Sequence, residues 1–254
     1  MGDLEVTTRF SDRVEAYIQS RPGYPREVYQ ILRARDVVQG GEVVADIGSG
    51  TGLSARLFLE VGHRVYGIEP NPPMREAGQV LLAEFPLFVS VDGRAEATTL
   101  ETDSVDLVVA GQAFHWFEPR ATAEEWRRIL RPGGSVVLMW NDRRLATTGF
   151  LMAYEDLLRR RAVDYSEVNH QNLNENDLRN FLGEFESFEV PNSQHFDLPG
   201  LRARAASSSY VPAPGHPLHA PFYQELDEIF THFATGGRVQ FEYDTRVFIF
   251  PLSR

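Results

Sequence analysis

The chain of 254 residues contains neither cysteine nor lysine, so all 25 of its basic side chains are arginine. Without cysteine, the protein has no disulfides, no thiolate metal ligands and no cysteine nucleophile. Without lysine, it cannot form a Walker-type phosphate loop, the ATP-binding lysine of a kinase, or a Schiff base to pyridoxal phosphate or a carbonyl substrate. The absence of lysine thereby excludes P-loop nucleotide hydrolases, protein kinases and enzymes that form a Schiff base.

Positive charge is also scarce, because 25 basic against 36 acidic side chains give a formal net charge of −11. This charge repels nucleic-acid phosphates unless a local basic face outweighs it, so a polynucleotide partner is disfavoured. No apolar run reaches the roughly 18 residues of a membrane span, and residues 1–10 lack the apolar core of a signal peptide. We therefore expect a cytoplasmic protein with no membrane partner.

Short apolar runs alternate with helical stretches over the first 140 residues, which predicts an α/β sheet protein. The runs are rich in β-branched residues, as is typical of buried parallel strands. The predicted strands are 43–47, 64–68, 87–91, 105–110 and 135–140, and the predicted helices between them are 54–61, 73–84 and 122–130. Thr122 and Glu125 have the spacing of a capping box at the start of the last helix. Pro132 and Gly133 are expected to end that helix.

The flanking regions predict further elements. Two short helices, 11–19 and 25–34, are expected before the sheet. After it we expect helices 150–163, 175–183 and 222–233, strands 188–196 and 239–250, and insertions at 142–187 and 198–221. The last strand alternates strictly, with Val239, Phe241, Tyr243, Thr245, Val247 and Ile249 on one face. The prediction is a Rossmann-like sheet of about seven strands, mostly parallel, with the last strand antiparallel and helical additions that form a lid.

Three alternate glycines give the strongest chemical signal, because Gly48, Gly50 and Gly52 follow a buried strand and precede a helix. Glycine lets the backbone turn tightly and lets a ligand approach, while the free N–H groups at the start of a helix favour an anionic group. A dinucleotide fold needs glycine at the sixth position of this loop, where the chain has Leu53. Glu69 ends the next strand, where its carboxylate could accept both hydroxyls of a ribose.

Five segments together resemble the successive motifs of class I S-adenosylmethionine-dependent methyltransferases. They are Asp46-Ile-Gly-Ser-Gly-Thr-Gly52, Glu69-Pro-Asn71, Gly93-Arg-Ala-Glu96, Val105-Asp-Leu-Val and Leu130-Arg-Pro-Gly-Gly134. Residues 21–25 and 112–117 are similar to the small-molecule branch that includes the trans-aconitate methyltransferase-like (methyltransferase type 11) proteins.

The resemblance implies S-adenosylmethionine as the cofactor and assigns its contacts by segment. The glycine loop would pack against the methionine part of the cofactor through Gly48, Gly50 and Gly52. Asp46 would lie near the α-amino group and Gln112 at the methionine end. Glu69 would bind the ribose, and the adenine would lie near Arg94, Ala95 and Glu96. Arg94 departs from the small or acidic residue that is more usual in the family, which weakens the assignment of the adenine contact.

His115 and Trp116 follow the fourth predicted strand, where doubly wound sheets bind their ligands. His115 is our candidate catalytic residue, since an imidazole can take a proton from a nucleophile. The alternative is a histidine that only orients its neighbours. Trp116 could form a wall of the sulfonium site or serve only in packing. His216 and His219 have no acidic residue nearby, so no metal site is expected.

Arginine binds carboxylates through paired hydrogen bonds, so an acidic small molecule is one candidate acceptor. The candidate substrate contacts are Arg21, Tyr24, His115, Trp116 and Arg246. Arg143, Arg144, Arg202 and Arg204 lie in the segments expected above the pocket. For each of these arginines, and for Arg246, the competing interpretation is a solvated surface charge, because arginine supplies every positive side chain of this protein.

The sequence thus predicts methyl transfer from S-adenosylmethionine to a small-molecule acceptor, with no metal. It predicts one methyltransferase domain, 1–254, with an N-terminal helical cap at 1–40, a cofactor-binding core at 41–140 and substrate-side elements at 141–254. A nicotinamide-dependent dehydrogenase is disfavoured by Leu53. A non-catalytic protein that senses S-adenosylmethionine stays open, because the chemistry demands no single obligatory residue. The sequence carries no signal for the oligomeric state.

Overall fold

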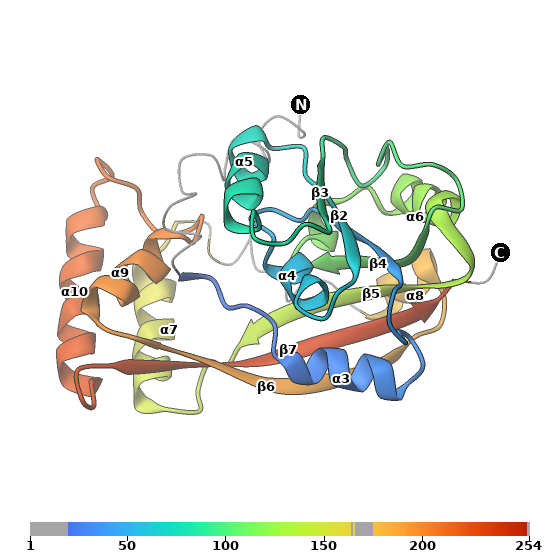
Figure 1. Cartoon of the computed structure of the whole chain (residues 1–254). Coiled ribbons are helices and arrows are strands. Elements are labelled where there is room, and N and C mark those ends of the chain that lie inside the picture. The colour runs from blue at the N-terminus through green and yellow to red at the C-terminus, as the bar shows by residue number, and fades with distance from the viewer. Residues whose placement is uncertain (1–19, 164, 166–174, 253–254) are drawn as a thin grey trace.

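A computed structural model describes residues 20–163, 165 and 175–252. Its centre is a seven-stranded sheet in the order β3-β2-β1-β4-β5-β7-β6 (Figure 1). The strands are β1 (Val43–Ile47), β2 (Arg64–Ile68), β3 (Phe88–Val91), β4 (Val105–Gly111), β5 (Leu130–Arg143), β6 (Glu186–Phe196) and β7 (Val239–Pro251). The strands from β3 to β5 pair in parallel, and β7 is antiparallel to both β5 and β6. The predicted fold class is confirmed.

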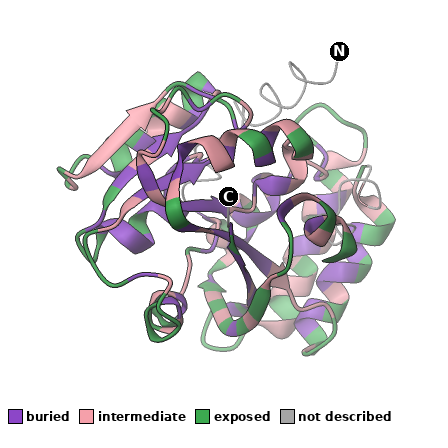
Figure 2. Cartoon of the chain, turned by 90° about the vertical axis from the view of Figure 1, so that its right-hand side faces the viewer, coloured by how far each residue is buried: buried purple, intermediate pink, exposed green. Residues whose placement is uncertain are grey.

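Helices cover both faces of this sheet. They are α3 (Arg26–Ala34), α4 (Leu53–Leu59), α5 (Pro72–Leu81), α6 (Pro119–Ile129), α7 (Gly149–Arg161), α8 (Glu175–Leu182), α9 (Leu198–Ala206) and α10 (His219–Phe233), with a 3-10 turn η1 (Phe114–Trp116). Apolar residues of α3 and α4 share one core with the sheet, whereas those of α6 and α8 share another. The strands are mostly buried and the outward helix surfaces are exposed (Figure 2). The predicted helix 11–19 lies outside the described residues.

A third hydrophobic cluster joins α7, α9 and α10 to the beginning of β7. Phe241 and Tyr243 of β7 are buried against Leu151, Leu201 and Phe222 from these helices. The three helices gather at one end of the long strands β6 and β7, away from α6 and α8 (Figure 1). The alternation predicted for β7 is confirmed, since every second residue from Val239 to Ile249 is buried. No helix among the described residues is long and apolar enough to span a membrane.

The predicted capping box is wrong, because α6 begins earlier than expected. The Glu118 carboxylate accepts hydrogen bonds from the backbone N–H groups of Arg120 and Ala121, and Pro119 occupies the first turn. A capping carboxylate followed by proline is a strong helix start, so Thr122 lies inside the helix. Glu125 instead accepts from the backbone N–H and hydroxyl of Thr98.

Two further elements differ from the prediction. Helix α9 was not expected within the insertion 198–221; the Asp197 carboxylate caps it by accepting from the Gly200 N–H at 2.9 Å, with a proline in its first turn. Strand β5 begins at Leu130, immediately after α6, and its register against β4 shifts between Val105 and Leu107. The shift accommodates residues 131–134 as a bulge, where Gly133 has φ +85°.

Candidate active site

The glycine loop after β1 is held in a conformation that only glycine adopts readily. Gly48, Gly50 and Gly52 have φ angles of +66°, +54° and +88°. The amides of Gly48 and Ser49 donate to the Ile68 carbonyl at 2.9 and 3.1 Å, which fixes the loop to the end of β2. A Cβ on Gly48 would lie 2.8 Å from the Cβ of Ala113. The loop therefore offers a backbone surface with no side chains of its own at these three positions.

Glu69 lies beside this loop at the end of β2. Its Oε2 accepts from the Gly50 N–H at 2.9 Å and its Oε1 from the Asn71 N–H at 2.8 Å. The residue is 9% exposed, and burial raises the pKa of its carboxyl despite these two hydrogen bonds. Each carboxylate oxygen has a second lone pair. Glu69 can therefore accept a pair of ligand hydroxyls without releasing the glycine loop.

Asp46 lies on β1, the strand next to β2, and is fully buried. Both of its oxygens lie 2.8 Å from the Ser54 hydroxyl, which donates to them. Burial is the main cause that raises the pKa of Asp46 to about 7; the Ser54 hydrogen bond opposes this rise and the Glu69 charge contributes to it. Asp46 does not line the pocket described below, whereas Ser54 does. Ser54 thus stands between the buried carboxylate and a ligand in that pocket.

The raised pKa of Asp46 predicts a specific dependence of stability on pH. Below about pH 4 the carboxyl is protonated in both the folded and the unfolded protein. Between about pH 4 and pH 7 only the unfolded chain releases the proton, so the free energy of unfolding should fall as the pH rises, by at most about 4 kcal/mol. Urea unfolding of the ligand-free Asp46→Asn variant across this range should show a flatter profile than wild type. The control is Asp92→Asn, whose carboxylate is 73% exposed. A variant that keeps the wild-type slope would contradict the assignment to Asp46.

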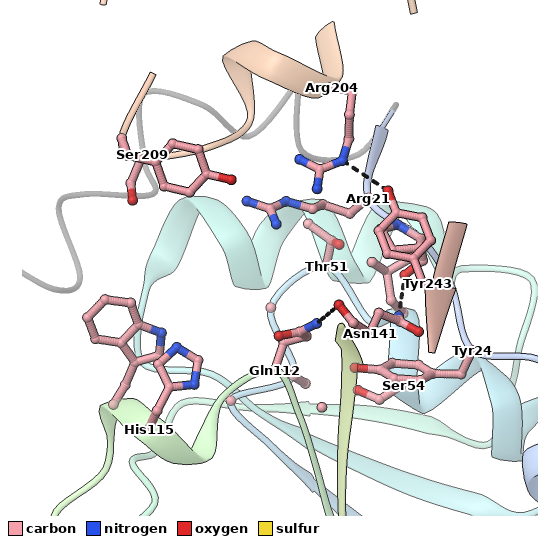
Figure 3. A pocket seen from close by; sticks show the side chains of 18 residues that line it. Arg21, Tyr24, Thr51, Ser54, Gln112, His115, Asn141, Arg204, Ser209 and Tyr243 are labelled. Atoms are coloured by element: carbon pink, nitrogen blue, oxygen red, sulfur yellow. Dashed lines mark hydrogen bonds between the residues drawn. The ribbon is translucent and has the colours of Figure 1, made fainter. Parts of the chain in front are cut away.

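A pocket lies where the ends of β1, β4 and β5 meet η1 and α9 (Figure 3). It contains seven of the predicted site residues, which are Arg21, Tyr24, Gly48, Gly50, Gln112, His115 and Trp116. It also contains residues that we did not predict as contacts, which are Pro22, Ser49, Thr51, Leu53, Ser54, Gly111, Asn141, Arg204, Ser209, Tyr210 and Tyr243. Segments far apart in sequence therefore converge at the glycine loop.

Gln112 and Asn141 form the centre of a hydrogen-bond network in the pocket. Gln112 has φ +56°, which is unusual for a residue with a side chain, and its Nε2 donates to the Asn141 carbonyl at 3.2 Å. Asn141 Nδ2 donates to the carbonyls of Pro22 and Gly23 at 3.3 Å, and its Oδ1 accepts from the Thr245 hydroxyl at 2.6 Å. The network joins the segment before α3 to the ends of β4 and β5.

His115 and Trp116 form one wall of the pocket, with ring centroids 4.9 Å apart. They belong to η1, the turn that follows β4. Phe114 of the same turn is buried, and its ring lies 5.7 Å from that of Trp126 in α6. This anchor explains why the turn presents the side chains of its other two residues to the pocket.

The other predicted cofactor residues do not line this pocket; besides Asp46 and Glu69 they are Gly52, Arg94, Ala95 and Glu96. Gly52 forms the N-cap of α4, where a Cβ would lie 2.4 Å from Leu82. Arg94, Ala95 and Glu96 follow β3, at the same edge of the sheet as the glycine loop. Ala95 is buried, and Glu96 accepts from the Glu118 N–H at 2.9 Å. A cofactor that extends from the glycine loop toward β3 would pass Glu69 and then reach these residues.

Arg246 must be corrected as a pocket residue, because the structure places it elsewhere. Its guanidinium lies over the Phe248 ring and forms ion pairs with Asp142, Glu175 and Glu189 at 3.3 to 3.6 Å. It is absent from the pocket lining. The arginine that enters the pocket from the C-terminal segments is Arg204, which the sequence analysis considered with surface charges. No group of three His, Asp or Glu residues within the described part of the chain could hold a metal ion.

Residues 45–138 match the family model of a methyltransferase domain. An uncharacterized methyltransferase of Mycobacterium tuberculosis (strain ATCC 25618 / H37Rv) is 37% identical over 139 residues, which cover 55% of this chain and 54% of the relative. An uncharacterized methyltransferase of Schizosaccharomyces pombe is 32% identical over 135 residues, 53% of each chain. The matches thus span about half the length of these curated relatives.

Solved structures share the fold over more of the chain. A structure assigned as a type II methyltransferase, from Anaeromyxobacter dehalogenans, has a TM-score of 0.70 at 20% identity and covers 92% of this chain and 99% of its own. A second structure is a Haemonchus contortus phosphoethanolamine N-methyltransferase, solved with S-adenosylhomocysteine and phosphomonomethylethanolamine. It has a TM-score of 0.55 at 14% identity, and the likeness covers 99% of this chain and 59% of that one. At these identities the likeness concerns the fold.

Proposed function

We propose that this protein transfers the methyl group of S-adenosylmethionine to a small-molecule acceptor bound in the pocket beside His115. The match of residues 45–138 to the family model of a methyltransferase domain supports the proposal. The observation that carries the proposal is the convergence of the glycine loop, Gln112 and His115 on one pocket. The lining combines polar and apolar side chains, as is typical of a pocket for a small organic molecule.

The described residues fit the cofactor at two points. Gly48 and Gly50 line the pocket at positive φ and carry no side chain, so a ligand would meet bare backbone there. The buried Glu69 carboxylate keeps lone pairs for a ribose diol. Glu69 and the glycine loop would hold the nucleoside and methionine parts, with Arg94, Ala95 and Glu96 near the base. The Asp46–Ser54 pair would attract the α-amino group.

When bound, S-adenosylmethionine supplies an electrophilic methyl group. The protein then has to hold the acceptor nucleophile in line with that group and exclude water. In this proposal His115 would take a proton from the nucleophile, Trp116 would form an aromatic wall for the sulfonium, and Gln112 would hold the methionine end. No covalent intermediate with the protein is required.

Calorimetry with S-adenosylmethionine, S-adenosylhomocysteine and NAD tests the cofactor assignment. We expect both methionine-derived ligands to bind and NAD not to, since Leu53 replaces the third glycine of a dinucleotide loop. A screen of metabolites with radiolabelled cofactor then tests the activity. Binding without S-adenosylhomocysteine formation with any acceptor would favour a sensor, and binding of NAD alone would overturn the proposal.

A further inference from the structure

Arg204 is a buried cation that lines the pocket and has no acidic partner among the residues that the structure describes. It is 5% exposed, lies on α9 and lines the pocket. Its side chain donates to the hydroxyl of Tyr243 at 3.3 Å (Figure 3). It also donates to the hydroxyl of Ser208 at 3.0 Å, with a longer contact of 3.5 Å to Ser207. No carboxylate among the described residues forms an ion pair with it. All of these partners are neutral.

Arg143, Arg204 and Tyr154 are referred to below as the arginine cluster, because both guanidinium charges act on the Tyr154 hydroxyl. The Arg143 side chain is 9% exposed and forms an ion pair with Glu155. Arg204 has no such carboxylate partner within the described part of the chain. A buried charge without a counter-ion costs several kcal/mol, so its retention at a pocket wall points to a ligand that neutralises it.

Two polar atoms of the arginine cluster also lack a hydrogen-bond partner within the described part of the chain. They are the hydroxyl of Tyr154, which is 1% exposed, and Nη1 of Arg143. The Arg143 guanidinium lies 5.1 Å from the centre of the Tyr154 ring. Both atoms can donate to an oxygen. The arginine cluster therefore has donors that no described residue satisfies.

We propose that Arg204 binds an anionic oxygen group, a carboxylate or a phosphate, of the methyl acceptor. This inference rests on the proposed function and names the class of its acceptor. Arg21 lines the same pocket, and its Nη2 donates to the Ser207 carbonyl at 2.9 Å, which brings a second guanidinium to the end of α9. The hydroxyl contacts use at most three of the five N–H donors of Arg204, so its fork can still engage an anion.

The position of Arg204 favours the acceptor over the carboxylate of the cofactor as its ligand. The segment that matches the methyltransferase domain ends at residue 138, whereas Arg204, Tyr210 and Tyr243 lie outside it. The proposed cofactor contacts lie inside that segment, so we expect the pocket residues that follow it to serve the acceptor.

Thermal unfolding with chosen probes tests the site without knowledge of the acceptor. Protein saturated with S-adenosylhomocysteine is titrated with sodium succinate, with sodium phosphate and with neutral succinamide at constant ionic strength. We expect the wild-type midpoint to rise with at least one of the two anions and to stay unchanged with succinamide; the responding anion distinguishes carboxylate from phosphate. The rise should vanish in Arg204→Met. It should persist in Arg202→Met, a control on the same helix whose side chain is 49% exposed and paired with Asp227.

Three results would overturn the proposal. They are equal responses to succinamide and to the anions, no response to either anion, or an undiminished response in Arg204→Met. If Arg204→Met does not fold, Arg204→Lys retains the charge and should respond with an apparent affinity about tenfold weaker, because lysine lacks the bidentate fork. A more than tenfold loss of S-adenosylhomocysteine affinity in either Arg204 variant would assign the residue to the cofactor and also overturn the proposal. These readouts measure binding, so a failure of the methyl-transfer proposal would appear separately, as a lack of product.

Discussion

Replacing His115 by alanine is expected to lower the turnover of methyl transfer by a factor on the order of 10² to 10⁴ and to leave S-adenosylhomocysteine affinity nearly unchanged. The reason is that a general base acts on the nucleophile in the transition state and contributes little to binding of the cofactor. His115 lines the pocket together with Gln112 and lies on a turn anchored by the buried Phe114, so an acceptor in that pocket would lie beside its imidazole.

The measurement is single-turnover transfer of radiolabelled methyl to an acceptor found in the metabolite screen. His195→Ala is the matched control, because His195 is exposed on β6 and does not line the pocket. A loss of less than tenfold in His115→Ala would show that the histidine only forms a wall and that proximity carries the reaction. A large loss accompanied by weaker cofactor binding would instead indicate that the variant disturbs η1.

The sequence is sufficient for the part of the site that depends on local patterns. The glycines after β1 and the short apolar runs are readable because tight turns and buried strands each demand particular residue types at close spacing. Gln112, His115 and Trp116 follow from the end of β4 in the same way, since ligands bind at the carboxyl ends of parallel strands. Asn141 follows the predicted strand 135–140 directly, so the same rule could have found it.

The arginines show where local patterns fail. The alternation of β7 correctly places Arg246 on the face opposite to Val247, but the direction of a side chain does not reveal which face a distant helix covers. Helices α7, α9 and α10 pack on the face of Phe241 and Tyr243, so Arg246 points toward α8 and pairs with Glu175. Arg204 lies on a helix that was not predicted, and its sequence neighbours do not distinguish a buried guanidinium from a solvated one.

Replacing Glu69 by alanine is expected to weaken the affinity for S-adenosylhomocysteine roughly 10- to 100-fold, which corresponds to about 1.5 to 3 kcal/mol for hydrogen bonds to a charged group. The Glu69 carboxylate is buried beside the glycine loop and accepts from the Gly50 N–H. Among the described residues no other acidic side chain forms a hydrogen bond with that loop, so none can take over its role. Titration calorimetry measures the change. Glu76→Ala, on the exposed side of α5, is the control.

Glu69 also stabilises the glycine loop, so the alanine variant could lose affinity by releasing Gly50 and not by losing a ribose contact. Glu69→Gln separates these effects, because it keeps the size of the side chain and one carbonyl oxygen for the Gly50 N–H. If Glu69 binds the ribose diol, S-adenosylhomocysteine should lose affinity in Glu69→Gln, whereas a 2′,3′-dideoxy analogue should bind wild type and Glu69→Gln with similar affinity. Equal losses for both ligands would mean that the carboxylate serves the loop alone, and an unchanged affinity in both variants would place the ribose elsewhere.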